Sequence, residues 1–322
     1  MMQALFIGQT YIDVTFLTDR MPTGDEKHVA SAYAISFGGN AVTAAFCCAK
    51  LGIVPDVITT VADDWLGRMF LDMAARYEIP IHSRKVRTSS LSFIMPNDGK
   101  RAIVRCRDDN YLHPFPILHL SGCRALHLDG HQPDAAIHYA KQCREAGIFT
   151  SLDGGGLRSN THELLAFIDV AIVAERLCQQ MGYEPAAMLD YLKSRGCRLG
   201  GVTLGERGMV WYDEMGVVRA LPALKVPSDR ILDTSGAGDV FHGAYIHSYL
   251  ANPAKCWEEH FRFARAAAAS NIWAMRPAYR HWRKLPAFSD IGACIQRKVG
   301  RSISLRCPIA AQARTSIGPI CG

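Results

Sequence analysis

Short apolar runs alternate with amphipathic segments along most of the chain. Residues 3–8 (QALFIG) predict a buried strand, and residues 41–51 (AVTAAFCCAKL) predict an apolar, small-residue helix after a Gly-Gly turn. The same patterns predict further strands at 54–62, 124–130, 149–155, 169–174 and 199–205, and helices near 65–77, 133–146, 161–167 and 185–195. Strands that alternate with helices indicate an α/β fold, a doubly wound and mostly parallel sheet with helices on both faces.

Two stretches break this rhythm. Residues 10–36 and 89–107 read as short strands separated by turns, with no helical period between them. We expect the two stretches to pair into a small β-strand lid over one end of the large sheet.

Composition narrows the class of protein. The 322 residues are 49% hydrophobic and 20% charged, as in globular enzymes, and no apolar run approaches the roughly 20 residues that cross a bilayer. The eleven cysteines are odd in number and show no CxxC or Cys/His metal spacing. We therefore expect a cytoplasmic protein with reduced thiols and no membrane partner.

The net charge of +6 is concentrated at one end of the chain. Residues 271–322 contain nine Lys or Arg residues and a single acid, Asp290, so the rest of the chain is slightly acidic. This distribution gives the body of the protein no basic surface for nucleic acid, and we expect none to bind there.

The segment richest in chemistry is residues 231–244, ILDTSGAGDVFHGA. Gly236, Ala237 and Gly238 precede an apolar helix, and such a turn directs free N–H groups toward one point, where the helix dipole adds positive potential. Asp239 could serve only as a helix cap, as most Asp residues before helices do. A carboxylate beside an anion hole is also what phosphoryl transfer to an alcohol requires.

This segment resembles the signature D-T-x-G-A-G-D of the PfkB, or ribokinase-like, carbohydrate kinase family, and it matches at every specified position. The resemblance implies ATP and Mg²⁺ as cosubstrates, Asp239 as catalytic base and Gly236, Ala237 and Gly238 as anion hole. It also places Asp233 and Ser235 where relatives bind an activating monovalent cation such as K⁺.

An earlier segment, residues 37–45 (FGGNAVTAA), is similar to the family's sugar-binding glycine motif. The resemblance implies substrate contacts at Gly38, Gly39, Asn40 and Thr43, although many members carry Asn where this chain has Thr43. Asp13, after the first strand, resembles the family Asp that binds sugar hydroxyls. A bare Asp at this place would otherwise be a turn former.

A third segment, residues 203–208 (TLGERG), resembles the family's nucleotide loop T-x-G-x-x-G and implies nucleotide contacts at Thr203, Gly205 and Gly208. Relatives usually carry an Asn-x-x-Glu element near residues 172–178, which this chain lacks. Glu175 is the candidate to replace it.

Substrate identity is less defined. Residues 39–45, Lys27, residues 152–154 and residues 239–243 are similar to the sulfofructose-kinase branch of the family. Lys27 and Arg105, on the lid stretches, could hold an anionic sugar substituent such as a phosphate or sulfonate, or they could simply be solvated.

The resemblance covers roughly residues 1–265, and we expect a kinase domain over residues 1–270. Family members end with a helix and a loop G-x-x-x-G-L-P, whereas residues 271–282 (NIWAMRPAYRHW) are rich in Trp and Arg without a helical period. A divergent basic tail and a shifted reading frame both remain open. A neighbouring frame can encode a family-like loop, which favours a frameshift in the alanine run 266–269. On that reading, residues from about Ala268 onward form a poorly ordered extension.

These observations predict an ATP-dependent sugar kinase that forms a homodimer through the lid. Two alternatives stay open: a nucleoside kinase of the same superfamily, and a degenerate sugar-binding protein without turnover.

Overall fold

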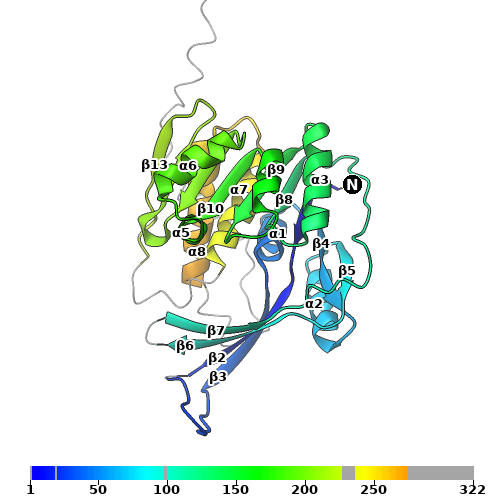
Figure 1. Ribbon diagram of the computed structural model, residues 1–322. Coiled ribbons are helices and arrows are strands. Elements are labelled where there is room, and N and C mark those ends of the chain that lie inside the picture. The colour runs from blue at the N-terminus through cyan, green and yellow to red at the C-terminus, as the bar shows by residue number, and fades with distance from the viewer. Residues whose placement is uncertain (1, 19, 98–99, 227–235, 275–322) are drawn as a thin grey trace, which may run out of the picture.

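A computed structural model describes residues 2–18, 20–97, 100–226 and 236–274, which form two β-sheets flanked by helices (Figure 1). Asp233 and Ser235, predicted to bind a monovalent cation, and residues 275–322 of the predicted tail lie outside the described residues.

The large sheet has nine strands in the order β13-β12-β11-β10-β9-β8-β1-β4-β5. Their bounds are β1 Ala4–Gly8, β4 Asp56–Ala62, β5 Ile81–Val86, β8 Ala125–Leu128, β9 Phe149–Gly154, β10 Val170–Ala174, β11 Leu199–Thr203, β12 Met209–Tyr212 and β13 Val218–Leu221. All neighbours pair in parallel except β11 with β12 and β12 with β13. The predicted doubly wound, mostly parallel sheet is confirmed, with an antiparallel edge.

Helices cover both faces of this sheet. One face packs against α1 (Asn40–Lys50), α2 (Trp65–Ala75), α7 (Ala237–Ala251) and α8 (Trp257–Ala274). The other packs against α3 (Pro133–Glu145), α4 (Thr161–Leu164), α5 (Glu175–Met181) and α6 (Pro185–Ser194), with single 3₁₀ turns at Leu165–Phe167 and Gly205–Arg207. Within β1, Phe6 belongs to the first core and Leu5 to the second, because successive side chains of a strand point to opposite faces.

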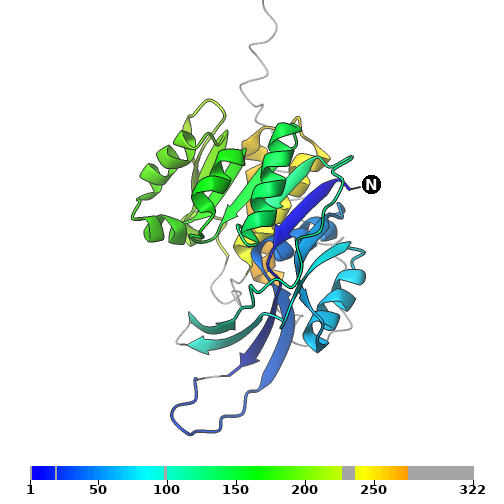
Figure 2. The same cartoon turned by 45° about the vertical axis from the view of Figure 1, so that its right-hand side comes forward.

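The small sheet contains β2 (Tyr11–Leu17), β3 (Ala32–Gly38), β6 (Leu91–Asn97) and β7 (Lys100–Cys106) in the order β3-β2-β6-β7. It comes from the two stretches that break the helical rhythm, and it projects from the large sheet where β1 ends (Figures 1 and 2). The predicted lid strands therefore form. Ser36, Asp13, Ser92 and Arg105 are register partners in successive strands, so their side chains share one face of this sheet.

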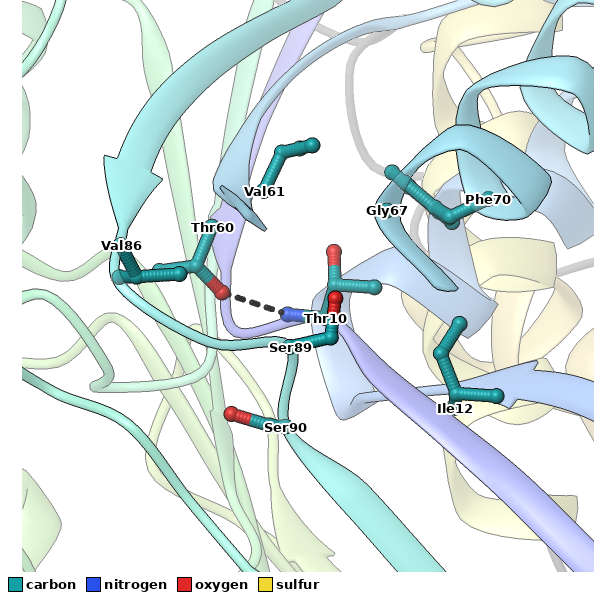
Figure 3. A pocket seen from close by; sticks show the side chains of 9 residues that line it. All are labelled: Thr10, Ile12, Thr60, Val61, Gly67, Phe70, Val86, Ser89 and Ser90. Atoms are coloured by element: carbon teal, nitrogen blue, oxygen red, sulfur yellow. Dashed lines mark hydrogen bonds between the residues drawn. The ribbon is translucent and has the colours of Figure 1, made fainter. Parts of the chain in front are cut away.

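The chain passes between the two sheets at Thr10 and again at Ser89 and Ser90. The Thr10 amide donates to Thr60 Oγ1 at 3.3 Å, and the Thr10 and Thr59 hydroxyls lie 2.6 Å apart. Figure 3 shows the small pocket at this junction, whose lining comes from β2, β4, α2, β5 and the connection to β6. Hydroxyl groups thus tie the two sheets together at the point where the chain passes from the large sheet to the small one.

Most of the extension predicted from about Ala268 lies outside the described residues. Its first residues continue α8 as far as Ala274. In the alanine run, Ala267 is buried, and Ala266 and Ala268 pack against the same core as Phe261 and Ala264.

The sequence patterns missed β5, α5, β12 and β13. These elements are short or lie at a sheet edge, and β5 (IHSRKV) is too polar for a buried strand. An edge strand needs only one paired side, so it carries a weaker apolar signal.

Candidate active site

The strand order of the large sheet reverses between β1 and β8, and an open α/β sheet binds its ligands at such a point, beyond the carboxyl ends of the strands. Gly8 ends β1 and Asp129 follows β8. A Cβ atom on Gly8 would lie 2.3 Å from Asp129 Oδ2, so a side chain there would displace the carboxylate. Asp129 accepts from the amides of Ala41 at 3.2 Å and His131 at 3.0 Å. The carboxylate is thereby fixed at the start of α1.

Asp239 lies in the first turn of α7, after Gly236, whose φ of 70° favours glycine. Gly238 is exposed, and apart from its chain neighbours and its own helix backbone no described atom lies within 4 Å of the position its Cβ would take. The first N–H groups of a helix have no acceptor within the helix. Among the described residues, the space at Gly238 beside Asp239 is therefore unfilled, and these N–H groups could donate to an anion there.

The pKa of Asp239 is raised well above its usual value. Burial of its carboxyl group is the main cause, and the negative charges of Asp153, Asp129 and Asp13 add to it, while a hydrogen bond with Thr43 opposes the rise. Four carboxyl groups from β2, β8, β9 and α7 thus face the same space. A carboxylate that holds its proton more tightly is a better proton acceptor than a free aspartate.

We predicted that Thr43 contacts substrate, and the structure shows a hydrogen bond between its side chain and the carboxyl group of Asp239. A Cβ atom on Gly236 would lie 3.5 Å from Thr43 Cγ2, so α1 packs against the beginning of α7 here. The threonine hydroxyl therefore contacts the candidate base itself.

The structure brings Asp13, Gly38, Gly39 and Asn40 close to one another. A Cβ atom on Gly38 would lie 2.2 Å from Asp13 Oδ2, and one on Gly39, at φ 108°, would lie 1.9 Å from the Gln9 carbonyl oxygen. Asn40 Nδ2 donates to Asp153 Oδ2 at 3.1 Å. The two glycines thus allow β3, β2 and α1 to meet at the junction of the sheets.

The pKa of Asp129 shifts in the opposite direction to that of Asp239, although the two carboxyl groups face the same site. Burial acts to raise the pKa of Asp129, but the charge and hydrogen bonds of His131 and the charge of Arg158 outweigh it and lower the pKa below its usual value. Arg158 Nε donates to the Asp129 carbonyl at 2.9 Å. One carboxyl group of the site is therefore held ionised while another is held ready for a proton.

Arg105 reaches the same region from the small sheet. Its guanidinium group lies 4.3 Å from the centre of the Tyr11 ring, and its Nε donates to Ser92 Oγ at 3.1 Å. Tyr11 is 3% exposed, and burial raises the pKa of its hydroxyl, whereas the charges of Arg105, Arg107 and Arg158 lower it. Three arginines from two different parts of the chain thus surround one tyrosine.

Lys27 is exposed on the connection between β2 and β3, at the free end of the small sheet (Figure 1). The structure does not bring it into the cluster that contains Arg105.

Thr203, Gly205 and Gly208 form a tight turn after β11. The Leu204 amide donates to the Gly208 carbonyl at 2.8 Å, and a Cβ atom on Gly208 would lie 2.2 Å from the Leu221 carbonyl oxygen. Arg207, within this turn, forms an ion pair with Glu175 at the start of α5. The loop after β11 and the residue considered for the missing Asn-x-x-Glu element are therefore in contact.

No group of three or more His, Cys, Asp or Glu side chains within the described ranges is arranged to hold a metal ion. Mg²⁺ is commonly bound through substrate phosphates and water with only one or two carboxylates, so a nucleotide-borne Mg²⁺ needs no such cage. In the same part of the chain, no helix is both long and apolar enough to cross a membrane.

Sequence reasoning did not select Asp129, Asp153, Arg158, His131 or Tyr11 as site residues. The two aspartates each follow a buried strand and precede a glycine, in Leu128-Asp129-Gly130 and Leu152-Asp153-Gly154. This repeated pattern at strand ends was a usable signal. No sequence pattern predicts that Arg158 or Tyr11 lies close to these site residues.

Comparison with known proteins agrees with this geometry. The family model described as "pfkB family carbohydrate kinase" matches residues 1–276, most of the chain. The chain belongs to the pfkB family of carbohydrate kinases. It therefore transfers a phosphoryl group from ATP to a sugar-like acceptor, as the sequence analysis predicted.

Individual relatives of this pfkB-family kinase are distant. The ribokinase of Lactococcus lactis is 25% identical over 76% of this chain and 83% of its own length. The deoxyribokinase of Salmonella typhi is 25% identical over 77% of this chain and 86% of its own length. A crystal structure of a putative ribokinase from Agrobacterium tumefaciens superposes with a TM-score of 0.79 at 22% identity, covering 93% of this chain and 99% of that one. The fold of this kinase is thus the ribokinase fold.

Proposed function

We propose that this kinase uses Asp239 as the general base for attack of an acceptor hydroxyl on the γ-phosphate of ATP. The observation that supports it is the carboxyl group of raised pKa beside the open space at the start of α7. As the acceptor oxygen attacks the γ-phosphorus, its proton passes to the Asp239 carboxylate. The bond between the γ-phosphorus and the bridging oxygen breaks, and ADP leaves.

The N–H groups at Gly236, Ala237 and Gly238 act as the anion hole of this reaction. They are directed at charge on the transferring group, where the helix dipole adds to them. No contact with the described residues explains why position 238 is a glycine. We infer that the missing side chain leaves room for the anion. Bound Mg²⁺ would neutralise charge on the ATP phosphates.

The acceptor binds between Asp13, Gly38, Gly39 and Asn40, with Thr43 orienting the base. Asp13 accepts hydrogen bonds from sugar hydroxyls, and the glycines let the sugar approach the backbone. Arg105 and Lys27 would hold an anionic substituent if the acceptor carries one. The grouping of Arg105 with Arg107 and Arg158 around Tyr11 favours Arg105 in this role over Lys27.

ATP binds on the side of α7 that faces the loop of Thr203, Gly205 and Gly208. The ion pair between Arg207 and Glu175 supports this loop from the start of α5. Asp233 and Ser235, immediately before α7, are proposed to bind K⁺ or another monovalent cation, by the family resemblance alone.

We further infer a homodimer through the lid. On the face of the small sheet opposite Asp13 and Arg105, the side chains of Tyr33, Phe93 and Val104 are 67%, 40% and 64% exposed. Phe93 is stacked on Phe16, with ring centres 6.4 Å apart. A second copy of this sheet would cover these apolar side chains.

The kinase domain is proposed to end near residue 270, followed by an anomalous tail over 271–322. A shifted reading frame after the alanine run accounts for the tail's composition, and resequencing the gene tests it. We place the protein in the cytoplasm, since the described cysteines are free thiols and mostly buried.

A coupled assay of ADP release across sugars, sugar phosphates and nucleosides, on a protein with a verified C-terminus, tests the function. We expect turnover with a sugar or sugar derivative. Turnover with nucleosides alone would favour a nucleoside kinase, the activity named for a relative in Thermococcus kodakarensis that is 23% identical. Calorimetric binding of a sugar without ADP release under any condition would indicate a degenerate binding protein.

A further inference from the structure

A chain of buried polar side chains runs from the acceptor site into the core beneath it. Asp239, His242 and Tyr245 are spaced by three residues along α7, so they follow one another down one side of the helix. Opposite them, the strands present His127, Ser151 and Asp153 toward the same layer of helices. Polar groups on a helix and on a sheet therefore face each other through an otherwise apolar interior.

The contacts along this chain are continuous. His127 Nδ1 lies 3.0 Å from Ser151 Oγ, Ser151 Oγ contacts the Tyr245 hydroxyl, and that hydroxyl lies 3.2 Å from His242 Nδ1. His242 Nε2 lies 3.6 Å from Asp153 Oδ1. The other oxygen of Asp153 accepts from Asn40 Nδ2. His242 thus connects the core to the carboxyl group that holds an acceptor-binding residue.

The protonation of His242 follows from this arrangement. Burial lowers the pKa of its imidazole, and the charge of Asp153 only partly opposes this, so the ring is neutral near neutral pH. A neutral imidazole has one N–H group, and its other nitrogen accepts. If Tyr245 donates to Nδ1, the proton is on Nε2, which faces Asp153. The opposite arrangement would direct a lone pair at the carboxylate, and charge repulsion disfavours it.

His242 is 3% exposed and is one helical turn from Asp239. The side chains of Asp153 and Asp239 interact, because the charge of Asp153 raises the pKa of Asp239. An imidazole that fixes Asp153 therefore affects both the acceptor-binding Asn40 and the candidate base Asp239. It orients the carboxyl group that holds Asn40, and it fixes the charge that keeps Asp239 ready to accept a proton.

We propose that His242 is a positioning residue which, through an N–H directed at Asp153, couples the acceptor site to the catalytic base. The proposal rests on the proposed role of Asp239 and extends it to a residue that touches neither substrate. The groups that face this pair are Asp129 on β8, Asp13 on β2, His127 on β8 and Tyr245 on α7.

The test compares three histidine variants in the full-length kinase. His242→Phe keeps an aromatic ring and removes both nitrogens, and His242→Gln keeps an N–H donor near the position of Nε2. His247→Phe is the matched control, because His247 lies on the same helix, is half-buried, and stacks on Phe263 away from the chain described above.

We expect His242→Phe to lower kcat/KM for the acceptor about 10-fold, because it removes an N–H group that lies 3.6 Å from the buried Asp153 carboxylate, with KM for ATP unchanged. His242→Gln should stay within about threefold of the wild type, and His247→Phe should leave both constants unchanged. Without this N–H group the Asp153 carboxylate is no longer held in place, so its charge raises the pKa of Asp239 less. The acid limb of kcat/KM should therefore move to lower pH in His242→Phe alone.

Equal kinetics for His242→Phe and His247→Phe would overturn the proposal, and so would a His242→Gln protein as impaired as His242→Phe. Acceptor binding by calorimetry separates this failure from that of the kinase assignment. A wild type that binds acceptor without turnover contradicts the assigned reaction, while weaker binding by His242→Phe still supports the positioning role. If His242→Phe does not fold, Tyr245→Phe removes only the hydroxyl and should shift the same constants in the same direction by a few fold. Unchanged constants in a folded Tyr245→Phe would also contradict the proposal.

Discussion

The two sheets of this kinase differ in how much of their surface is buried. The large sheet is covered by helices on both faces, and Phe6, Leu5 and Ile7 of its central strand are completely buried. The small sheet is open, and Tyr33, Phe93 and Val104 remain largely exposed. The site carboxylates Asp129 and Asp153 lie at strand ends of the large sheet, whereas the open sheet carries Asp13 within β2 and Arg105 near the end of β7.

This difference suggests separate roles, with the large sheet holding the groups proposed for phosphoryl transfer and the small sheet holding those proposed to select the acceptor. Asp239, Asp153 and Asp129 are fixed by helix starts and strand ends of the large sheet, and backbone amides and histidines surround them. Arg105 is held by its hydrogen bond to Ser92 and by its contact with the Tyr11 ring. We therefore expect changes at the large sheet to stop the reaction, and changes at the small sheet to select among acceptors.

The largest effect should come from Asp239→Asn. The neutral amide keeps the shape of the side chain but cannot take the proton, so turnover should fall by about 10²–10⁴-fold, while ATP and acceptor still bind. Steady-state kinetics together with calorimetry measures both. Retention of more than about a tenth of wild-type turnover, with chemistry rate-limiting, would assign the base elsewhere.

Phe6→Ala tests how strongly the large sheet depends on its core. Phe6 is completely buried and its ring lies 5.1 Å from that of His127, so its loss should lower the free energy of unfolding by about 3–5 kcal/mol. Val104→Ala, at an exposed position of the small sheet, should change it by less than about 0.5 kcal/mol. Denaturant unfolding provides both values. A loss well above that at Val104 would mean that a partner covers this face, as in the proposed dimer.

Arg105→Gln tests the recognition role of the small sheet. If Arg105 holds an anionic group, anionic acceptors should lose about 1.5–3 kcal/mol of binding, and neutral sugars should be almost unaffected. Paired assays with a sugar and its phosphate measure the difference. Arg124→Gln is the control, since Arg124 is exposed at the opposite end of β8. Equal losses for both acceptors would reject an anionic pocket.

The smallest effect concerns pH. The charge of Asp153 contributes to the raised pKa of Asp239, so Asp153→Asn should lower that pKa. A base must be ionised to act, so kcat/KM falls as the pH drops through its pKa. The acid limb of the pH profile should consequently move to lower pH in Asp153→Asn, although its amide still accepts from Asn40. A shift to higher pH would show that Asp153 is not the charge that acts on Asp239.

Much of the fold followed from local patterns. The buried strands and the longer helices have strong apolar periods, and residues 10–36 and 89–107 stand out because they lack a helical period. The edge strands β5 and β13 did not follow, since edge positions tolerate polar residues. The four-residue strand β12, which lies next to β13, was too short to show a period of its own.

The candidate site divides in the same way. Asp239, Gly38, Gly39 and Asn40 belong to short segments with glycines and helix starts, so the sequence alone was enough to select them as candidates. The surroundings of Asp129, Asp153, His242 and Arg158 depend on which strands lie side by side and which helix covers them. Burial of apolar surface across the whole chain makes that choice, so only the tertiary structure decided that the pKa of Asp239 is raised and that of Asp129 is lowered.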